Sequence, residues 1–118
     1  MELTSIKAES INEFFGSLQE AFVGTWRQHL EASSRNVHVI LNEFYDELPD
    51  LVDTLIEDYM GIFGKIENFS NIIVVPKCPI EYLETLSSLC ENSKYLLQGK
   101  SELESDLDAT AKKVVTHQ

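Results

Sequence analysis

Apolar residues recur at three- and four-residue steps along two long stretches of the chain, which is the spacing of one face of an α-helix. The first stretch covers about residues 5–30 and the second about residues 35–62. The apolar positions of the first are Ile11, Phe14, Phe15, Leu18, Phe22 and Trp26. Those of the second are Val37, Leu41, Phe44, Leu48, Val52, Leu55 and Tyr59. The pattern predicts two long amphipathic helices joined by a short turn.

A proline, Pro49, interrupts the second stretch. Proline inside a helix removes one backbone hydrogen bond and bends the helix axis. The apolar pattern keeps its phase on both sides of Pro49, which favours a single helix with a kink. Two helices that meet at Pro49 are the alternative.

Two further helices are predicted in the second half of the chain. Helical spacing returns from Pro79 to about Gly99 and again after Ser101. Residues 65–78 lack this spacing, although 71–76 form a largely apolar run. A lone strand would have no partner to pair with. We therefore expect an extended, half-buried crossover between the second and third helices.

The link lengths predict how the helices are connected in space. Helices joined by short links pack as antiparallel hairpins. The longer link can reach ~45 Å at ~3.3 Å per residue, enough to return along the bundle, so the second and third helices could be parallel. The predicted fold is all-α, a ferritin-like four-helix bundle with one long crossover, in a single domain over residues 1–118.

Charge narrows the possible partners. The chain has 9 Lys and Arg against 20 Asp and Glu, a formal net charge of −11. The chain has no cluster of basic residues, which excludes nucleic acid and anionic membrane surfaces as expected partners. No apolar run reaches the ~20 residues of a membrane span. Two cysteines without metal-ligand spacing are too few for a disulfide scaffold, which favours the cytoplasm.

The acidic residues are concentrated in one window. Residues 36–64 contain no Lys or Arg and seven acids, namely Glu43, Asp46, Glu47, Asp50, Asp53, Glu57 and Asp58. At about 100° per residue, two of these acids share a stripe of the second helix with a histidine and an asparagine. The members of this stripe are His38, Asn42, Asp53 and Glu57. We expect the other acids, Asp46, Glu47, Asp50 and Asp58, on the solvated surface.

The stripe can bind a metal ion only if two chains contribute to one site. His38 and Asp53 are separated by ~22 Å of helix rise, too far for one ion. Two copies of the helix, antiparallel about a two-fold axis near residues 46–47, would place His38 opposite Asp53 and Glu57 of the other chain. Imidazole and carboxylate together suit Fe²⁺, Mn²⁺ or Zn²⁺. His29 can join His38 because the chain turns between the two helices. A structural histidine and two solvated acids are the alternative.

A family resemblance covers about residues 22–64. It lies in the run Trp26-Arg27-Gln28-His29-Leu30, then Ser33-Ser34, His38, Asn42-Glu43-Phe44-Tyr45-Asp46, Asp53, Glu57 and Gly61. This pattern resembles the first two helices of the Dps-type mini-ferritins. It is still more similar to a group of short Dps-like proteins encoded by large tailed bacteriophages.

The resemblance implies a metal site at a two-fold interface between first and second helices. His29 and His38 of one chain and Asp53 and Glu57 of the other would be the ligands, and iron or another divalent metal the cofactor. Asn42 stands where Dps proteins have a further acidic ligand. The implied function is metal binding by a homodimer, with ferroxidase activity left open. The alternative is a non-enzymatic phage protein that binds a host protein or small ligand and uses the bundle as a scaffold with a vestigial site.

Overall fold

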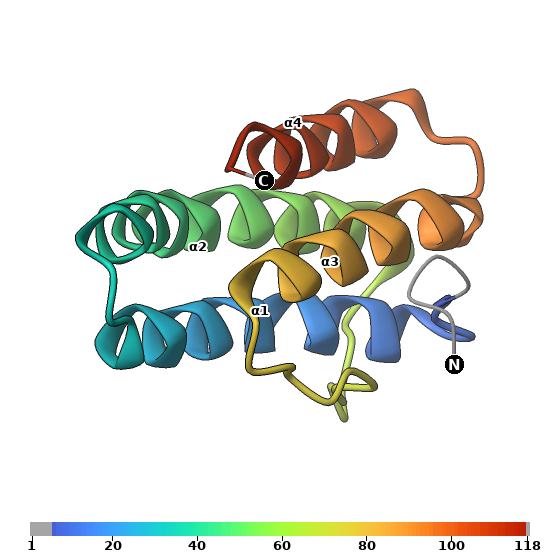
Figure 1. Cartoon of the computed structure of the whole chain (residues 1–118). Coiled ribbons are helices and arrows are strands. Elements are labelled where there is room, and N and C mark those ends of the chain that lie inside the picture. Colours follow the sequence, from blue (N-terminus) through green and yellow to red (C-terminus); the bar gives the residue numbers. More distant parts are fainter. Residues whose placement is uncertain (1–5, 118) are drawn as a thin grey trace.

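The structure, a computed structural model, describes residues 6–117, with side chains to residue 114. In this part of the chain every assigned element is a helix, and four of these elements are α-helices (Figure 1). They are α1 (Ile11–Glu31), α2 (Arg35–Phe63), α3 (Pro79–Ser93) and α4 (Ser101–His117), with a short 3₁₀ helix, η2 (Lys94–Leu97), after α3. The all-α prediction is confirmed. Since α2 continues through Pro49, the single-helix interpretation of the second stretch is confirmed as well.

The start of α1 differs from the prediction. The helix begins at Ile11 and not near residue 5, which lies outside the described residues. Ser10 caps it, because its hydroxyl accepts a hydrogen bond from the Glu13 N–H at 3.2 Å. The preceding segment is bound to the end of α3 and to η2. There the Ala8 N–H donates to Ser93 Oγ at 3.0 Å, and the Tyr95 hydroxyl donates to the Ala8 carbonyl at 2.8 Å.

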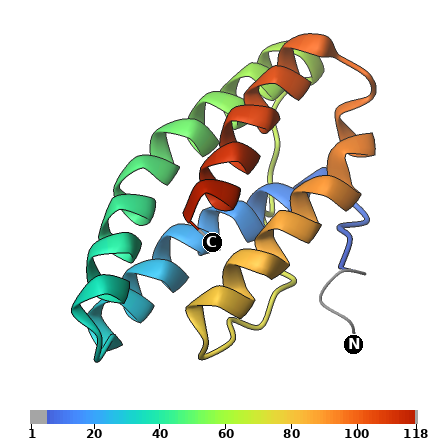
Figure 2. The same cartoon turned by 45° about the horizontal axis from the view of Figure 1, so that its top comes forward.

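The four helices pack in a ring around one core. Helix α1 packs against α2, α2 against α4, α4 against α3, and α3 against α1. Figures 1 and 2 show α4 alongside α2, and α3 alongside α1. Each helix contributes fully buried side chains, among them Phe15, Phe44, Tyr82 and Leu103. No helix in the described part of the chain has both the length and the apolar character needed to cross a membrane.

The connection between α2 and α3 follows α1 along its length. Near the start of α1, Asn12 accepts a hydrogen bond from the Ser70 N–H at 3.2 Å through its carbonyl oxygen. Near the end of α1, the Gln28 side chain donates to the Pro76 carbonyl at 2.8 Å. Antiparallel α1 and α2 place this second end beside the start of α2. The connection therefore runs back along the bundle, and α3 begins at the same end of the bundle as α2.

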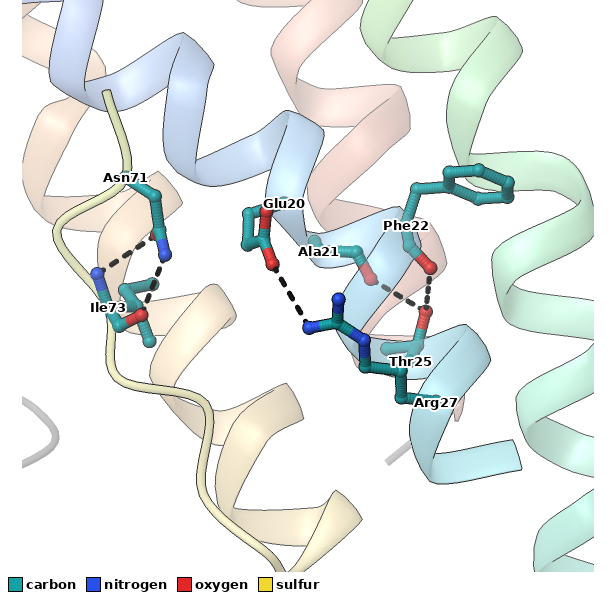
Figure 3. A network of polar contacts seen from close by, with 7 residues as sticks. All are labelled: Glu20, Ala21, Phe22, Thr25, Arg27, Asn71 and Ile73. Atoms are coloured by element: carbon teal, nitrogen blue, oxygen red, sulfur yellow. Dashed lines mark hydrogen bonds and ion pairs between the residues drawn. The ribbon is translucent and has the colours of Figure 1, made fainter. Parts of the chain in front are cut away.

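Glycine allows the connection to approach α1 closely. A Cβ added at Gly16 would overlap the backbone of Ser70. Figure 3 shows the connection beside α1, with the side chain of Asn71 directed toward Ile73 of the same segment. The Asn71 side chain accepts from the Ile73 N–H at 3.0 Å and donates to the Ile73 carbonyl at 2.9 Å. The connection is thus stiffened by its own hydrogen bonds and fixed against the helix.

Candidate metal centre

Two histidines meet at the corner between α1 and α2. Helix α1 ends at Glu31 and α2 begins at Arg35, with Ser34 as the N-cap of α2. This short turn brings His29 against His38, and their rings stack with centroids 3.7 Å apart and an interplanar angle of 27°. The expectation that the turn would join the two histidines is confirmed.

Reciprocal hydrogen bonds to the backbone hold the two rings. Nδ1 of His29 lies 2.8 Å from the carbonyl oxygen of His38, and Nδ1 of His38 lies 3.0 Å from the carbonyl oxygen of His29. A carbonyl oxygen can only accept, so each Nδ1 carries the proton. In the neutral ring Nε2 then has a free lone pair. Metal-binding histidines are commonly held in this way, with the N–H of the other ring nitrogen bonded to a carbonyl.

The two rings differ in exposure. His29 is 7% exposed, whereas His38 is on the surface. The ring of Tyr45 packs edge-on against His29 with centroids 5.1 Å apart. Its hydroxyl donates to Asn42 Oδ1 at 3.0 Å. His29 is therefore fixed by packing, while His38 can be reached from solvent.

The predicted carboxylate ligands lie further along α2. Asp53 and Glu57 are both exposed and one helical turn apart. Asp53 borders a hollow of about 130 Å³ between α1 and α2. The other residues that line this hollow are mostly apolar: Leu18, Gln19, Phe22, Leu48, Pro49, Val52 and Ile56. One carboxylate thus lies at the edge of an apolar depression.

These features lie on one surface, which we call the outer face of α1 and α2. Its exposed members are Trp26, His38, Asn42, Asp53 and Glu57. Phe22 links its parts, since it lines the hollow and also packs near Trp26 and Tyr45, with ring centroids at 6.3 and 5.9 Å. The outer face carries the histidine pair toward one end and the carboxylates toward the other.

A single chain does not assemble the predicted ligand set. Among the residues that the structure describes, no group of three or more His, Cys, Asp and Glu side chains could hold a metal ion. His29 and His38 form one half of the set, and Asp53 and Glu57 form the other. The joining of the two halves depends on a second chain and stays a prediction.

One acidic residue lies elsewhere than the sequence suggested. Asp58 was expected on the solvated surface, but it is half-buried between α2 and α4. Its carboxyl group is hydrogen-bonded to that of Asp106. Burial, and then the neighbouring charge of Asp58, raise the pKa of Asp106 to about 6. Helical phase does place Asp58 and Asp53 on different sides of α2, but only the packing of α4 shows that one side is covered.

A second acidic residue of the window is also engaged by α4. Glu47 forms an ion pair with Lys113. Glu47 is exposed, as expected, but α4 lies close enough to this side of α2 for Lys113 to reach it. The sequence gives no sign of this pairing, since the two residues are far apart along the chain.

Comparison with known proteins gives one match. The model of a family of unknown function, DUF5856, matches residues 29–116, which include all four predicted ligands. No curated protein and no solved structure matches the chain. The relation to Dps-type proteins accordingly stays a prediction.

Proposed function

The chain belongs to this family of unknown function, and we propose that it binds a divalent metal ion, by preference iron, at a site shared between two copies of the chain. His29 and His38 of one copy and Asp53 and Glu57 of the other are the proposed ligands. The observation that carries this proposal is the reciprocal bonding of the two histidines, which leaves Nε2 of both rings free.

The chemistry of these residues fits a divalent ion. Two imidazoles and two carboxylates supply the nitrogen and oxygen donors that Fe²⁺, Mn²⁺ and Zn²⁺ accept. The two carboxylate charges balance the charge of the ion. Three of the four proposed ligands, His38, Asp53 and Glu57, are already exposed.

A two-fold arrangement of α2 would bring the halves together. All three of His38, Asp53 and Glu57 lie on one uninterrupted helix, α2, which supports the use of helical spacing to relate them. With a two-fold axis near residues 46–47, His38 of each copy lies opposite Asp53 and Glu57 of the other. Such a dimer has two equivalent sites.

The path of the chain supports a Dps-like reading of this function. The connection along α1 makes α2 and α3 run in the same direction, as in ferritin-like bundles with one long crossover. In this proposal the chain is a Dps-like protein that pairs through α1 and α2. Bound iron would supply one-electron chemistry toward peroxide or oxygen, and the carboxylates would stabilise the more highly charged ferric ion.

A second function is favoured by one residue of the outer face. Asn42 is neutral where Dps proteins have an acidic ligand, and its side-chain oxygen accepts a hydrogen bond from Tyr45. Together with the exposed Trp26, this would suit a non-enzymatic phage protein with a vestigial metal site. The outer face would then bind a host protein or small ligand.

Mixing of variants tests the shared site directly. Neither His38→Ala nor the double variant Asp53→Asn/Glu57→Gln has a complete site as a homodimer. A mixed dimer has one complete site, made of the histidines of the second variant and the carboxylates of the first. We expect anaerobic titration with Fe²⁺ to show weak binding to each variant alone and one restored site per mixed dimer.

The controls separate metal binding from the scaffold function. Glu84→Gln, an exposed change on α3, should leave the titration unchanged. Iron oxidation by peroxide, compared between the unchanged protein and His38→Ala, tests the ferroxidase step. If the unchanged protein binds no metal, or if each variant binds it fully by itself, the proposed function is wrong.

A further inference from the structure

The outer face of α2 carries negative charge without local compensation. Among the described residues, Asp53 and Glu57 form no ion pair within the chain. Residues 36–64 contain no Lys or Arg, so Arg35, at the far end of α2, is the nearest basic residue that precedes them on this helix. Two copies that meet through this face would place at least four carboxylates in one seam, those of Asp53 and Glu57 of each copy. Repulsion between these like charges opposes association when no cation is present.

The same face carries apolar surface that favours association. Trp26 is 44% exposed, and the hollow beside Asp53 is lined mostly by apolar side chains. Burial of apolar surface favours association in proportion to the area removed from water. The association of two copies therefore depends on two opposed contributions, apolar burial and carboxylate repulsion.

A divalent cation changes only the unfavourable contribution. Each half of the ligand set offers two donors, and a bound ion would neutralise the carboxylates of one copy while it engages the histidines of the other. Because the site is complete only in the pair, metal affinity and dimer affinity must rise together by the same factor.

On the basis of the shared site proposed above, we propose that a divalent metal ion controls dimerisation. The metal-free chain is mainly monomeric, and binding of one ion at each of two equivalent sites joins two copies through the outer faces of α1 and α2. The dimer dissociation constant falls by roughly ten- to a hundredfold when metal is bound. The partner is thus a second copy of this chain, and the extent of dimerisation depends on whether metal is bound.

Analytical ultracentrifugation of the full chain tests this control. The chelator-treated protein is compared with protein saturated with Zn²⁺, a redox-silent probe, and with Fe²⁺ under anaerobic conditions. We expect the tighter dimer in both metal-bound samples. Without metal, about 0.5 M NaCl should strengthen association, since it shortens the Debye length to roughly 4 Å.

Two variants should change association in different ways. Asp53→Asn/Glu57→Gln removes four charges per dimer, so this variant should dimerise better than the unchanged chain without metal and should no longer respond to Zn²⁺. His38→Ala should stay monomeric with or without Zn²⁺. Glu84→Gln/Glu91→Gln on α3 removes the same number of charges from exposed positions outside the outer face, and it should retain the metal response.

The outcomes separate this inference from the proposed function. If the protein binds Zn²⁺ at the four ligands but dimerises equally well without it, metal control is wrong and the metal site stands. If the protein binds no metal, both are wrong. If, without metal, the carboxylate variant dimerises no better than the unchanged chain, the carboxylates do not oppose association and metal control is again wrong.

Discussion

Two sides of α1 are built in opposite ways. On the side of the connection and α3, Gly16 lies under the backbone of Ser70, and Gly24 lies against the ring of Tyr82. On the outer face, Trp26 is 44% exposed and His29 reaches across to the backbone of α2. The inner side has no room for additional atoms, whereas the outer face ends in solvent.

The acidic residues of α2 show the same contrast. Asp53 and Asp58 are one and a half turns apart, yet Asp53 is exposed and Asp58 is half-buried opposite Asp106. Burial and the like charge of Asp58 raise the pKa of Asp106, whereas Asp53 is exposed to solvent and is a proposed metal ligand. The molecule thus separates the contacts that hold its fold from the residues proposed for chemistry. Substitutions on the two sides should have separable effects.

The largest effect is expected at Gly16. In Gly16→Ala the added methyl group meets the Ser70 backbone, so the connection itself must move. Overpacking of this kind should cost about 3 kcal/mol. Urea unfolding followed by circular dichroism measures the loss. An unchanged unfolding midpoint would show that the connection is not held against α1 as described.

A smaller loss is expected at Gly24. The new Cβ of Gly24→Ala would lie 2.7 Å from Tyr82 Cε2 and 2.9 Å from the Tyr82 hydroxyl oxygen. A side chain can shift more easily than backbone, so we expect a loss of about 2 kcal/mol.

A second substitution, at Tyr82, tests whether this steric overlap causes the loss of stability. The Tyr82 hydroxyl is buried and has no hydrogen-bond partner in the described part of the chain. Tyr82→Phe removes one of the clashing atoms without breaking a bond. The double variant Gly24→Ala/Tyr82→Phe should therefore be more stable than the sum of the single changes predicts. Strict additivity in urea unfolding would argue against the contact.

Stability should fall as the pH rises through about 6, the raised pKa of Asp106. A raised carboxyl pKa in the folded state means that the protonated form is favoured there. The contribution to stability is present below the ordinary pKa of 3.8 and is lost as the folded pKa is passed. We expect a change of about 1 kcal/mol after allowance for solvent screening.

Two substitutions assign this pH dependence. Asp106→Asn should remove it and should stabilise the protein at neutral pH, because the repulsion by Asp58 and Glu102 is lost. Asp53→Asn, on the outer face, should leave it in place. Thermal unfolding over this pH range provides the measurement. A pH profile that is the same in Asp106→Asn and the unchanged protein would assign the effect to other groups.

The smallest effect on stability is expected on the outer face. His38 is exposed, and its replacement removes one hydrogen bond to the His29 carbonyl. His38→Ala should cost about 0.5–1 kcal/mol while it abolishes the proposed metal binding. A loss comparable to that of Gly16→Ala would mean that the histidine pair serves the fold rather than a ligand.

Much of the fold could be predicted from the sequence because helical periodicity is a local property. The apolar stripe of α2 kept its phase through Pro49, and the helix is continuous there. The start of α1 was predicted too early. The apolar pattern allowed an earlier start, but Ser10 caps the helix so that it begins at Ile11. The third helix was predicted to continue to about Gly99, but α3 ends at Ser93 and the short 3₁₀ helix η2 follows it.

The candidate site could be predicted only in part. Spacing on one helix related His38, Asp53 and Glu57, because residues on a regular helix have known relative positions. The contact between His29 and His38 depended on the geometry of the turn between α1 and α2. The pairing of Asp58 with Asp106 could not be predicted, since it depends on which side of α2 is covered by α4.

By itself, the sequence determined four amphipathic helices, an acidic second helix and the residue types available for metal binding. These properties follow from local spacing and composition. The tertiary structure alone decided that the two histidine rings bond each other's backbone and that the connection runs along α1. It also decided that Asp58 is half-buried while Asp53 is exposed. Burial and hydrogen bonding depend on neighbours from distant parts of the chain, and helical periodicity does not specify these neighbours.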